Sequence, residues 1–111
     1  MDKSINAYER KLSWKEAKKI IKKGNKHKYG PILIAIKKSQ EWRFRINLKK
    51  EVKPAHKRNY IKRVIREVYR TSKPKIDDPH IVVFTVLNNI PDLDFHEFKN
   101  EYLNYFSKNN E

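Results

Sequence analysis

The sequence predicts an α+β fold in which helices cover a single mixed β-sheet. One segment alternates strictly between apolar and polar residues, as a half-buried strand does, and two short runs rich in β-branched residues are typical of buried strands. Three further segments repeat their apolar residues at helical spacing, which gives the order helix, strand, strand, helix, strand, helix. The strands are expected at 31–36, 42–49 and 80–86, and the helices at 14–23, 55–70 and from 95 onward.

Length and composition limit the class of protein. With 111 residues, 38% of them hydrophobic and 36% charged, the chain is expected to form one domain over 1–111 around a modest core. No stretch approaches the roughly 20 apolar residues of a membrane span, and the N-terminus lacks the apolar segment of a signal peptide. Because the sequence has no cysteine, disulfides and thiolate metal sites are excluded. We expect a cytoplasmic protein whose residues 1–12 form a loose basic arm.

The first helix is marked at both ends. Ser13 and Glu16 have the capping-box spacing, in which a hydroxyl and a carboxylate bind the N-terminal amides of a helix. Gly24 is typical of a helix C-terminus. The outer face is a row of lysines that fits either solubility alone or contact with a polyanion: Lys15, Lys18, Lys19, Lys22 and Lys23.

Basic loops separate the first strands. Residues 25–31 are expected to be a turn in which one more strand is possible near 26–30, and Lys38–Glu41 is expected to be a hairpin loop. The strand at 42–49 has a polar face, which is either an ordinary solvent-exposed surface or one that binds an anion. The period of two places Trp42, Phe44, Ile46 and Leu48 on one face and Arg43, Arg45, Asn47 and Lys49 on the other.

The longest helix divides its residues most sharply. Its aliphatic side is formed by Ile61, Val64, Ile65 and Val68. Like charges at helical spacing on the other side destabilise the helix by about 0.2–0.5 kcal/mol per pair. A merely solvated face would intersperse glutamates, but only Glu67 is present, so a polyanionic partner explains the face better. The cations and the amide on this side are Arg58, Asn59, Lys62, Arg63, Arg66 and Arg70.

The C-terminal third follows a different pattern. Pro74 is expected to stop the long helix, and 75–80 is a polar loop. Asp94 and Glu97 repeat the capping pattern before the last helix. An aromatic stripe at helical spacing is expected to belong to the core: Phe95, Phe98, Tyr102, Tyr105 and Phe106.

Charge is distributed unevenly along the chain. Residues 1–75 contain 25 Lys and Arg against 6 acids, a balance of +19, whereas 76–111 contain 2 against 7, a balance of −5. The basic part has the electrostatic footprint of a nucleic-acid-binding protein. An anionic membrane surface is the competing partner, but the apolar faces are all needed for a core.

No catalytic constellation is visible. The four histidines lack the spacings of zinc ligands, two glycines cannot form a phosphate-binding loop, and the carboxylates are not clustered as a Mg²⁺-dependent nuclease requires. Asp77, Asp78 and His80 could suggest a cation site, but a loop after the stopped helix explains them better. We therefore expect no catalytic residue and no metal site within the protein itself.

Residues 55–67, AHKRNYIKRVIRE, resemble the signature of the bacterial ribonuclease P protein subunit, which usually reads A-V-x-R-N-R-I-K-R-x-x-R-E. Residues 43–52 align without gaps with the family's preceding R-L-G-x-S-V-S-K-K-V. Ile81–Val83 match its D-I-V-V strand, with His80 in place of the aspartate. The resemblance covers roughly 12–107 and combines the motif, its flanking strand and the order of elements.

The resemblance implies a two-layer α/β sandwich like a domain of ribosomal protein S5, with a left-handed β-α-β crossover that departs from the usual hand. It implies the non-catalytic subunit of an endoribonuclease in which a catalytic RNA, with Mg²⁺, removes 5′ leaders from precursor tRNA and no second protein is obligatory. The signature helix would contact that RNA through Lys57, Arg58, Asn59, Lys62, Arg63, Arg66 and Arg70. A cleft between the sheet and the first helix would hold the leader through Arg43, Arg45, Asn47, Lys49 and Lys50.

The sequence departs from the family pattern at several further positions, among them Glu51, which is usually lysine, and Lys53, which is usually glycine. Tyr60 replaces the second arginine of the signature, where it could stack on RNA or pack within the protein. The family's cleft aromatics fall here on Ala17, Ile21 and Ala35, so these positions do not supply base stacking, worth about 1–3 kcal/mol per base. Leader recognition would then depend more on the cations of the neighbouring strand.

Two other functions remain compatible with a basic helix on a small α+β domain. One is a ribosomal or general RNA-binding protein without a role in processing. The other is a DNA-binding domain that places the same helix in a major groove. The order of elements counts against the second, because no short turn joins this helix to another as in helix-turn-helix proteins.

Overall fold

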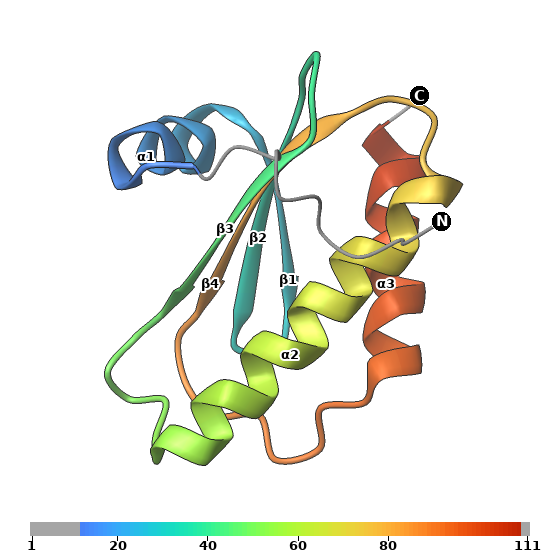
Figure 1. Ribbon diagram of the computed structural model, residues 1–111. Coiled ribbons are helices and arrows are strands. Elements are labelled where there is room, and N and C mark those ends of the chain that lie inside the picture. The colour runs from blue at the N-terminus through green and yellow to red at the C-terminus, as the bar shows by residue number, and fades with distance from the viewer. Residues whose placement is uncertain (1–11, 110–111) are drawn as a thin grey trace.

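In the computed structural model, which describes residues 12–109, helices cover both faces of a four-stranded mixed sheet (Figure 1). The α+β class and the mixed sheet are confirmed, and the additional strand considered near 26–30 is present. The elements in chain order are α1 (Trp14–Lys23), β1 (Asn25–Tyr29), β2 (Ile32–Lys38), β3 (Arg43–Leu48), α2 (Ala55–Ser72), the 3-10 helix η1 (Lys73–Lys75), β4 (His80–Val86) and α3 (Phe95–Asn109).

The strand order corrects one prediction. The sheet has the order β1-β2-β4-β3, so β4 lies between β2 and β3. Strand β4 pairs antiparallel with β2 and parallel with β3. The expectation that Lys38–Glu41 closes a hairpin is therefore wrong, because the strands that it joins are not neighbours. Turn-forming residues predict that the chain changes direction, but they do not predict whether the two flanking strands pair with each other.

Helix α2 connects the parallel strands β3 and β4. Viewed with α2 in front of the strands, β3 and β4 both run downward and β4 follows to the right of β3, which makes the crossover left-handed (Figure 1). This is the hand that the resemblance implies. The helix continues two residues beyond the expected end at Arg70, and Pro74 is accommodated in the first turn of η1, where its missing N–H is not needed.

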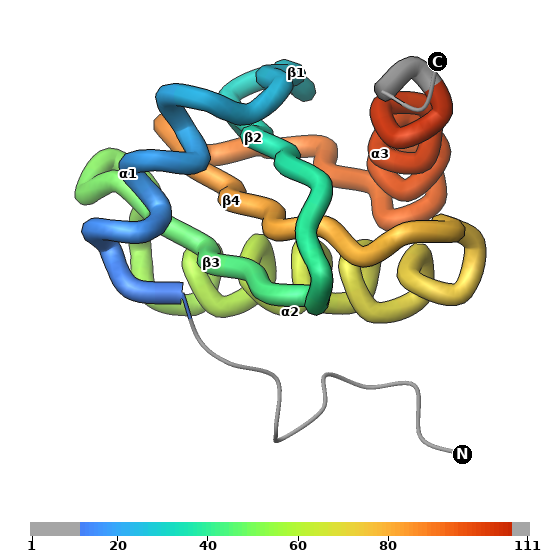
Figure 2. The backbone as a smooth tube through the Cα atoms, turned by 90° about the horizontal axis from the view of Figure 1, so that it is seen from above, coloured from blue at the N-terminus to red at the C-terminus, as the bar shows by residue number. Residues whose placement is uncertain are grey.

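The larger core lies between the sheet and the pair α2 and α3. The aliphatic side of α2 and the aromatic stripe of α3 pack there against one sheet face, as predicted. Tyr69 of α2 is fully buried, and its ring stacks on that of Phe44 at 4.4 Å. The opposite face carries α1 alone, over a smaller cluster that includes Ala17, Ile20 and Val83. Seen from above, α1 and α3 stand on opposite sides of the sheet (Figure 2).

The prediction of a loose arm over residues 1–12 is wrong for the last of these residues. The expected basic arm falls mainly on residues 1–11, which lie outside the described residues. Leu12, which we assigned to the arm, is buried at 1% exposure in the α1 cluster. Residues 12–109 contain no helix of the length and apolarity that crossing a membrane requires.

His80, the first residue of β4, is buried beside the rings of Trp42 and Phe106. Its Nδ1 lies 2.7 Å from the carbonyl oxygen of Asp78, which therefore accepts a hydrogen bond from the ring. The Asp78 carboxylate is instead paired with Lys38 at 3.2 Å. The His80 ring and the Asp78 carboxylate thus both have partners within the protein.

Burial lowers the pKa of His80 below its ordinary value of 6.5. The unfolded chain then binds a proton more readily than the folded one, so the free energy of unfolding should fall as the pH drops below about 6.5 toward the folded-state pKa. Urea unfolding at pH 8, 6 and 5 measures this. The variant His80→Gln should show a shallower decline across the same interval, and an unchanged decline would assign it to other groups.

Candidate nucleic-acid interface

The solvent side of α2 presents cations from the signature segment. The helix forms because an aliphatic stripe at helical spacing buries against the sheet and α3. The same spacing directs the polar residues outward. Lys57, Asn59, Arg63 and Arg66 are exposed, whereas Arg58, Lys62 and Arg70 are half-buried.

Arg58 is held by the chain that precedes its helix. Its Nη1 donates to the carbonyl oxygens of Lys49 at 3.0 Å and Val52 at 2.9 Å. The guanidinium thus fixes the connection between β3 and α2, and part of its donor capacity is used within the protein. Sequence spacing could not show this, because the accepting groups are backbone atoms of a loop.

Arg70 is also engaged, at the other end of the helix. Its Nε donates to Glu67 at 3.0 Å, and its Nη2 makes a second, shorter contact with the same carboxylate. The hydrogen bond from Arg70 lowers the pKa of Glu67. The exposed cations of α2 therefore lie between Lys57 and Arg66.

Strand pairing arranges the α1 side of the sheet in three rows. Directly opposed residues of adjacent strands share a face, so the register places polar residues of β3 at the ends of rows that cross the sheet. On this face lie Arg43, Arg45 and Asn47. The apolar residues that alternate with them along β3 point to the other face, as predicted. The rows are Lys37–Ile81–Arg43, Lys26–Ala35–Val83–Arg45 and Lys28–Leu33–Thr85–Asn47.

Helix α1 covers the middle row. Ala17 is fully buried and Ala35 is 4% exposed, so small side chains allow the helix to lie directly on the strands. Gly24 continues this close approach, because a Cβ there would lie 2.8 Å from the carbonyl oxygens of Ile20 and Ile36. The positions where the family carries aromatics are thus used here for packing.

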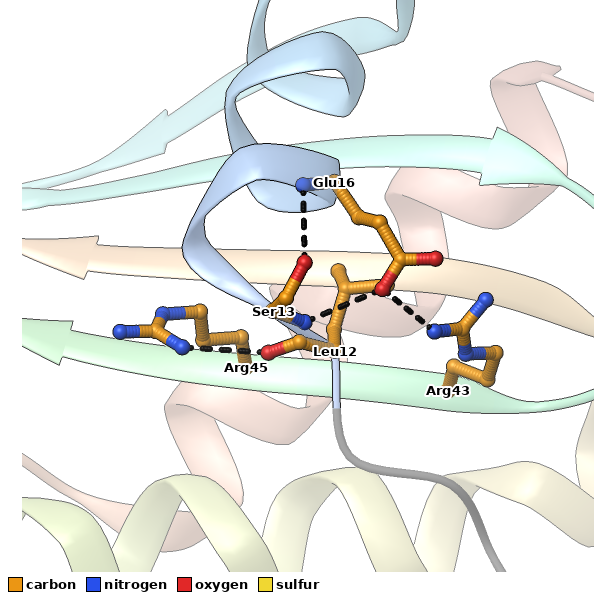
Figure 3. A network of polar contacts seen from close by, with 5 residues as sticks. All are labelled: Leu12, Ser13, Glu16, Arg43 and Arg45. Atoms are coloured by element: carbon orange, nitrogen blue, oxygen red, sulfur yellow. Dashed lines mark hydrogen bonds and ion pairs between the residues drawn. The ribbon is translucent and has the colours of Figure 1, made fainter.

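Glu16 joins α1 to the edge of the sheet. Its carboxylate accepts from the backbone N–H of Ser13 at 3.2 Å, completing the predicted capping box, and from Nη2 of Arg43 at 2.8 Å (Figure 3). These two bonds lower the pKa of Glu16 to about 2. Arg43 is only 8% exposed and its charge is neutralised at neutral pH. It is therefore placed less favourably for a leader phosphate than its position in the sequence suggests.

Arg45 lies on the other side of the start of α1. Its Nη1 donates to the carbonyl oxygen of Leu12 at 3.1 Å (Figure 3). Its Nε donates to Oδ1 of Asn47 at 2.6 Å. Within the described residues no carboxylate pairs with it. Lys49 and Lys50, at the end of β3, are both exposed.

A groove of about 310 Å³ opens between α1 and the first row of the sheet. Of the predicted cleft residues only Arg43 lines it; Arg45, Asn47, Lys49 and Lys50 lie elsewhere. Sequence analysis missed Lys37 as a site residue, although its place in β2 opposite Ile81 puts it on the α1 side. The complete lining is Leu12, Glu16, Lys19, Ile20, Lys23, Lys37, Arg43 and Ile81.

Tyr60 bridges α2 and the link that leads to α3. Its hydroxyl donates to the carbonyl oxygen of Leu93 at 3.2 Å, although 48% of the residue is exposed. The hydroxyl of Tyr60 therefore ties α2 to this link, while about half of the residue remains accessible.

Comparison with known proteins places these features in a family. Residues 6–110 match the model of a family described as Ribonuclease P. The ribonuclease P protein component of Dictyoglomus thermophilum is 38% identical over 79 residues, which cover 69% of this chain and 66% of that protein. That of Dictyoglomus turgidum is 39% identical over 74 residues, which cover 65% of this chain and 62% of that protein. The matched region thus spans slightly less than two thirds of each relative.

Solved structures share the fold. The RNase P protein from Thermotoga maritima superposes with a TM-score of 0.71 at 22% identity, covering 89% of this chain and 96% of that one. The RNase P protein of Staphylococcus aureus gives a TM-score of 0.70 at 22% identity, covering 93% of this chain and 94% of that one. At such identity the likeness concerns the fold, whereas the family model covers nearly the whole sequence. The chain therefore belongs to the family of bacterial ribonuclease P protein components.

Proposed function

We propose that this protein is the protein subunit of ribonuclease P and that it acts by binding RNA, not by hydrolysing it. The observation that carries the proposal is the exposed cationic span of α2, which coincides with the family signature. Within residues 12–109 no carboxylate forms an ion pair with Lys57, Lys62, Arg63 or Arg66. These side chains are available to neutralise phosphates, the interaction that supplies most of the affinity for a folded RNA.

In this proposal the catalytic RNA, with Mg²⁺, performs the hydrolysis that removes the 5′ leader of precursor tRNA in the cytoplasm. Residues 12–109 contain no group of three His, Asp or Glu side chains placed to hold a metal ion, and no step is assigned to a protein-bound metal. The protein contributes by positioning: α2 docks on the catalytic RNA, while the α1 side of the sheet faces the substrate.

The α1 side of the sheet is the proposed site for the leader. Arg45, Lys49 and Lys50 place cations along and beyond β3, and Asn47 adds an amide. Arg43 contributes mainly by holding α1 through Glu16. Strand alternation alone suggested that Arg43 and Arg45 contact the leader equally, and the present proposal gives them different roles.

Reconstitution tests the proposal directly. The protein is mixed with ribonuclease P RNA at an Mg²⁺ concentration too low for the RNA to act alone, and cleavage of precursor tRNA is followed. We expect the protein to restore cleavage at the mature 5′ end without a second protein. A ribosomal or general RNA-binding protein would bind RNA under these conditions but would leave cleavage unchanged, and that result would refute the proposal.

A further inference from the structure

Trp14 is an exposed indole at the start of α1. Although its spacing fits the apolar side of that helix, 43% of its surface is accessible, whereas Ala17 and Ile20 of the same helix are buried. Single exposed aromatic residues are common and need no explanation by themselves. The surroundings of Trp14 supply additional evidence.

Two cations lie over this one ring. The guanidinium carbon of Arg45 and Nζ of Lys18 are each 5.6 Å from the ring centroid. Arg45 comes from β3 and Lys18 from the next turn of α1, so two separate elements bring positive charge to the same aromatic surface. An exposed aromatic ring beside cations is the arrangement by which proteins bind single-stranded nucleic acid, with the ring stacking on a base and the cations contacting phosphates.

The uncovered part of the sheet begins next to this ring. Arg45, which contacts Trp14, also donates to Asn47, the β3 member of the row Lys28–Leu33–Thr85–Asn47. We call this the open row, because α1 packs over the middle row and Leu33, at its centre, is 37% exposed. A strand of RNA that crosses the open row would meet Lys28 at one end and Arg45 near the other.

The usual aromatic positions of the cleft cannot serve here. Ala17 and Ala35 have no ring, and Ile21 is packed against the small α1 cluster. Among residues 12–109, the exposed aromatic residue on α1 is Trp14, one helical turn before Ala17, and it does not line the groove that Glu16 and Lys19 line.

We propose that Trp14 is the base-stacking platform for the single-stranded 5′ leader, which lies over the open row with its phosphates near Arg45 and Lys18. This inference rests on the function proposed above and names the residue that recognises the leader. The positive surroundings favour a nucleic acid over a protein segment as the occupant. A single unpaired base on the indole would also explain why a tryptophan is exposed on a helix in which Ala17 and Ile20 are buried.

The test compares precursor and mature tRNA binding to the reconstituted complex. We expect Trp14→Ala to weaken precursor binding by about 5- to 150-fold, the range that one stacked base supplies, and to leave mature tRNA binding unchanged. Trp14→Phe should retain most of the preference. Phe95→Leu is the matched control, since Lys99 lies 5.8 Å from the Phe95 ring but on α3, across the sheet from α1.

Fluorescence supplies a second readout. The chain has two tryptophans, and Trp42→Phe leaves Trp14 as the sole tryptophan, whose emission can be excited selectively over that of tyrosine. A single-stranded oligonucleotide of leader sequence should then quench its emission, and Arg45→Ala should reduce the quenching.

The outcomes separate the two levels of the argument. If the unaltered protein binds precursor and mature tRNA equally, the leader site of the proposed function fails. If the preference exists but survives Trp14→Ala, only the role of Trp14 is overturned. If Trp14→Ala and Trp14→Phe lose the preference for precursor equally and both lower the urea midpoint, Trp14 has a structural role within the protein. The inference is then likewise overturned.

Discussion

Replacing Arg63 and Arg66 together by alanine is expected to weaken binding of the catalytic RNA by about 100-fold at physiological salt. Both side chains are exposed on α2, and neither forms an ion pair within the described residues. Two charge-assisted hydrogen bonds at about 1.5 kcal/mol each account for this loss. The dependence of affinity on salt should also become shallower by about two units in the log–log slope, because two phosphates are no longer neutralised.

A charge-matched variant controls for net charge. Lys75→Ala with Lys99→Ala removes the same two positive charges at η1 and α3, away from the exposed cations of α2. It should change the affinity little and leave the slope close to that of the unaltered protein. Equal effects from the two double variants would mean that only overall charge matters, and the specific role of the α2 face would then be wrong. Filter binding across a series of salt concentrations measures both quantities.

Gly24→Ala is expected to destabilise the fold by about 2–3 kcal/mol. The added methyl group would lie 2.8 Å from the carbonyl oxygens of Ile20 and Ile36, and both are backbone atoms, so either α1 or β2 must shift. Because α1 forms one wall of the groove and carries Trp14, leader-dependent affinity should fall as well. Urea unfolding and precursor binding together measure the two effects.

Gly30 offers the matched control for this substitution. It has a φ of +56°, and no atom lies within 4 Å of the place that an added methyl group would occupy. Glycine is therefore favoured at this position by the backbone conformation and not by a lack of space. Asparagine tolerates this left-handed conformation, and Gly30→Asn should cost no more than about 1 kcal/mol. If the two variants were equally stable, close packing of α1 on β2 would not be the reason for a glycine at 24.

Local patterns predicted the elements of the fold well, since each depends on neighbouring residues. The helix at 14–23 has the predicted bounds, and its capping box is a local signal. Gly24 has an extended backbone, with φ of −77°, and not the left-handed conformation typical of a glycine after a helix, so the reason for a glycine there is its contact with β2. Alternation placed the faces of β3 correctly. Strand β1, with the sequence NKHKY, was expected as a turn with only a possible strand, because an edge strand with few apolar residues gives a weak pattern. Its pairing with β2 supplies what the local sequence lacks.

The site could be predicted only in part, for a related reason. Helical spacing identified the cations of α2 but could not show that Arg58 binds loop carbonyls. Strand alternation identified Arg43 and Arg45 as neighbours on one face, yet α1 separates them, with Glu16 neutralising the first and Trp14 contacting the second. These differences arise from contacts between distant segments, which periodicity does not encode.

The placement of charge in the fold has a consequence for how quickly the protein finds its partner. The exposed acids Asp92, Asp94, Glu97 and Glu101 belong to α3 and the link before it, across the sheet from the lysines of α1. Such a molecule has a large electric dipole moment, and the field of an RNA exerts a torque on it before contact. The protein should therefore arrive already turned so that these four carboxylates face away from the RNA, and its association rate constant should fall steeply as ionic strength rises.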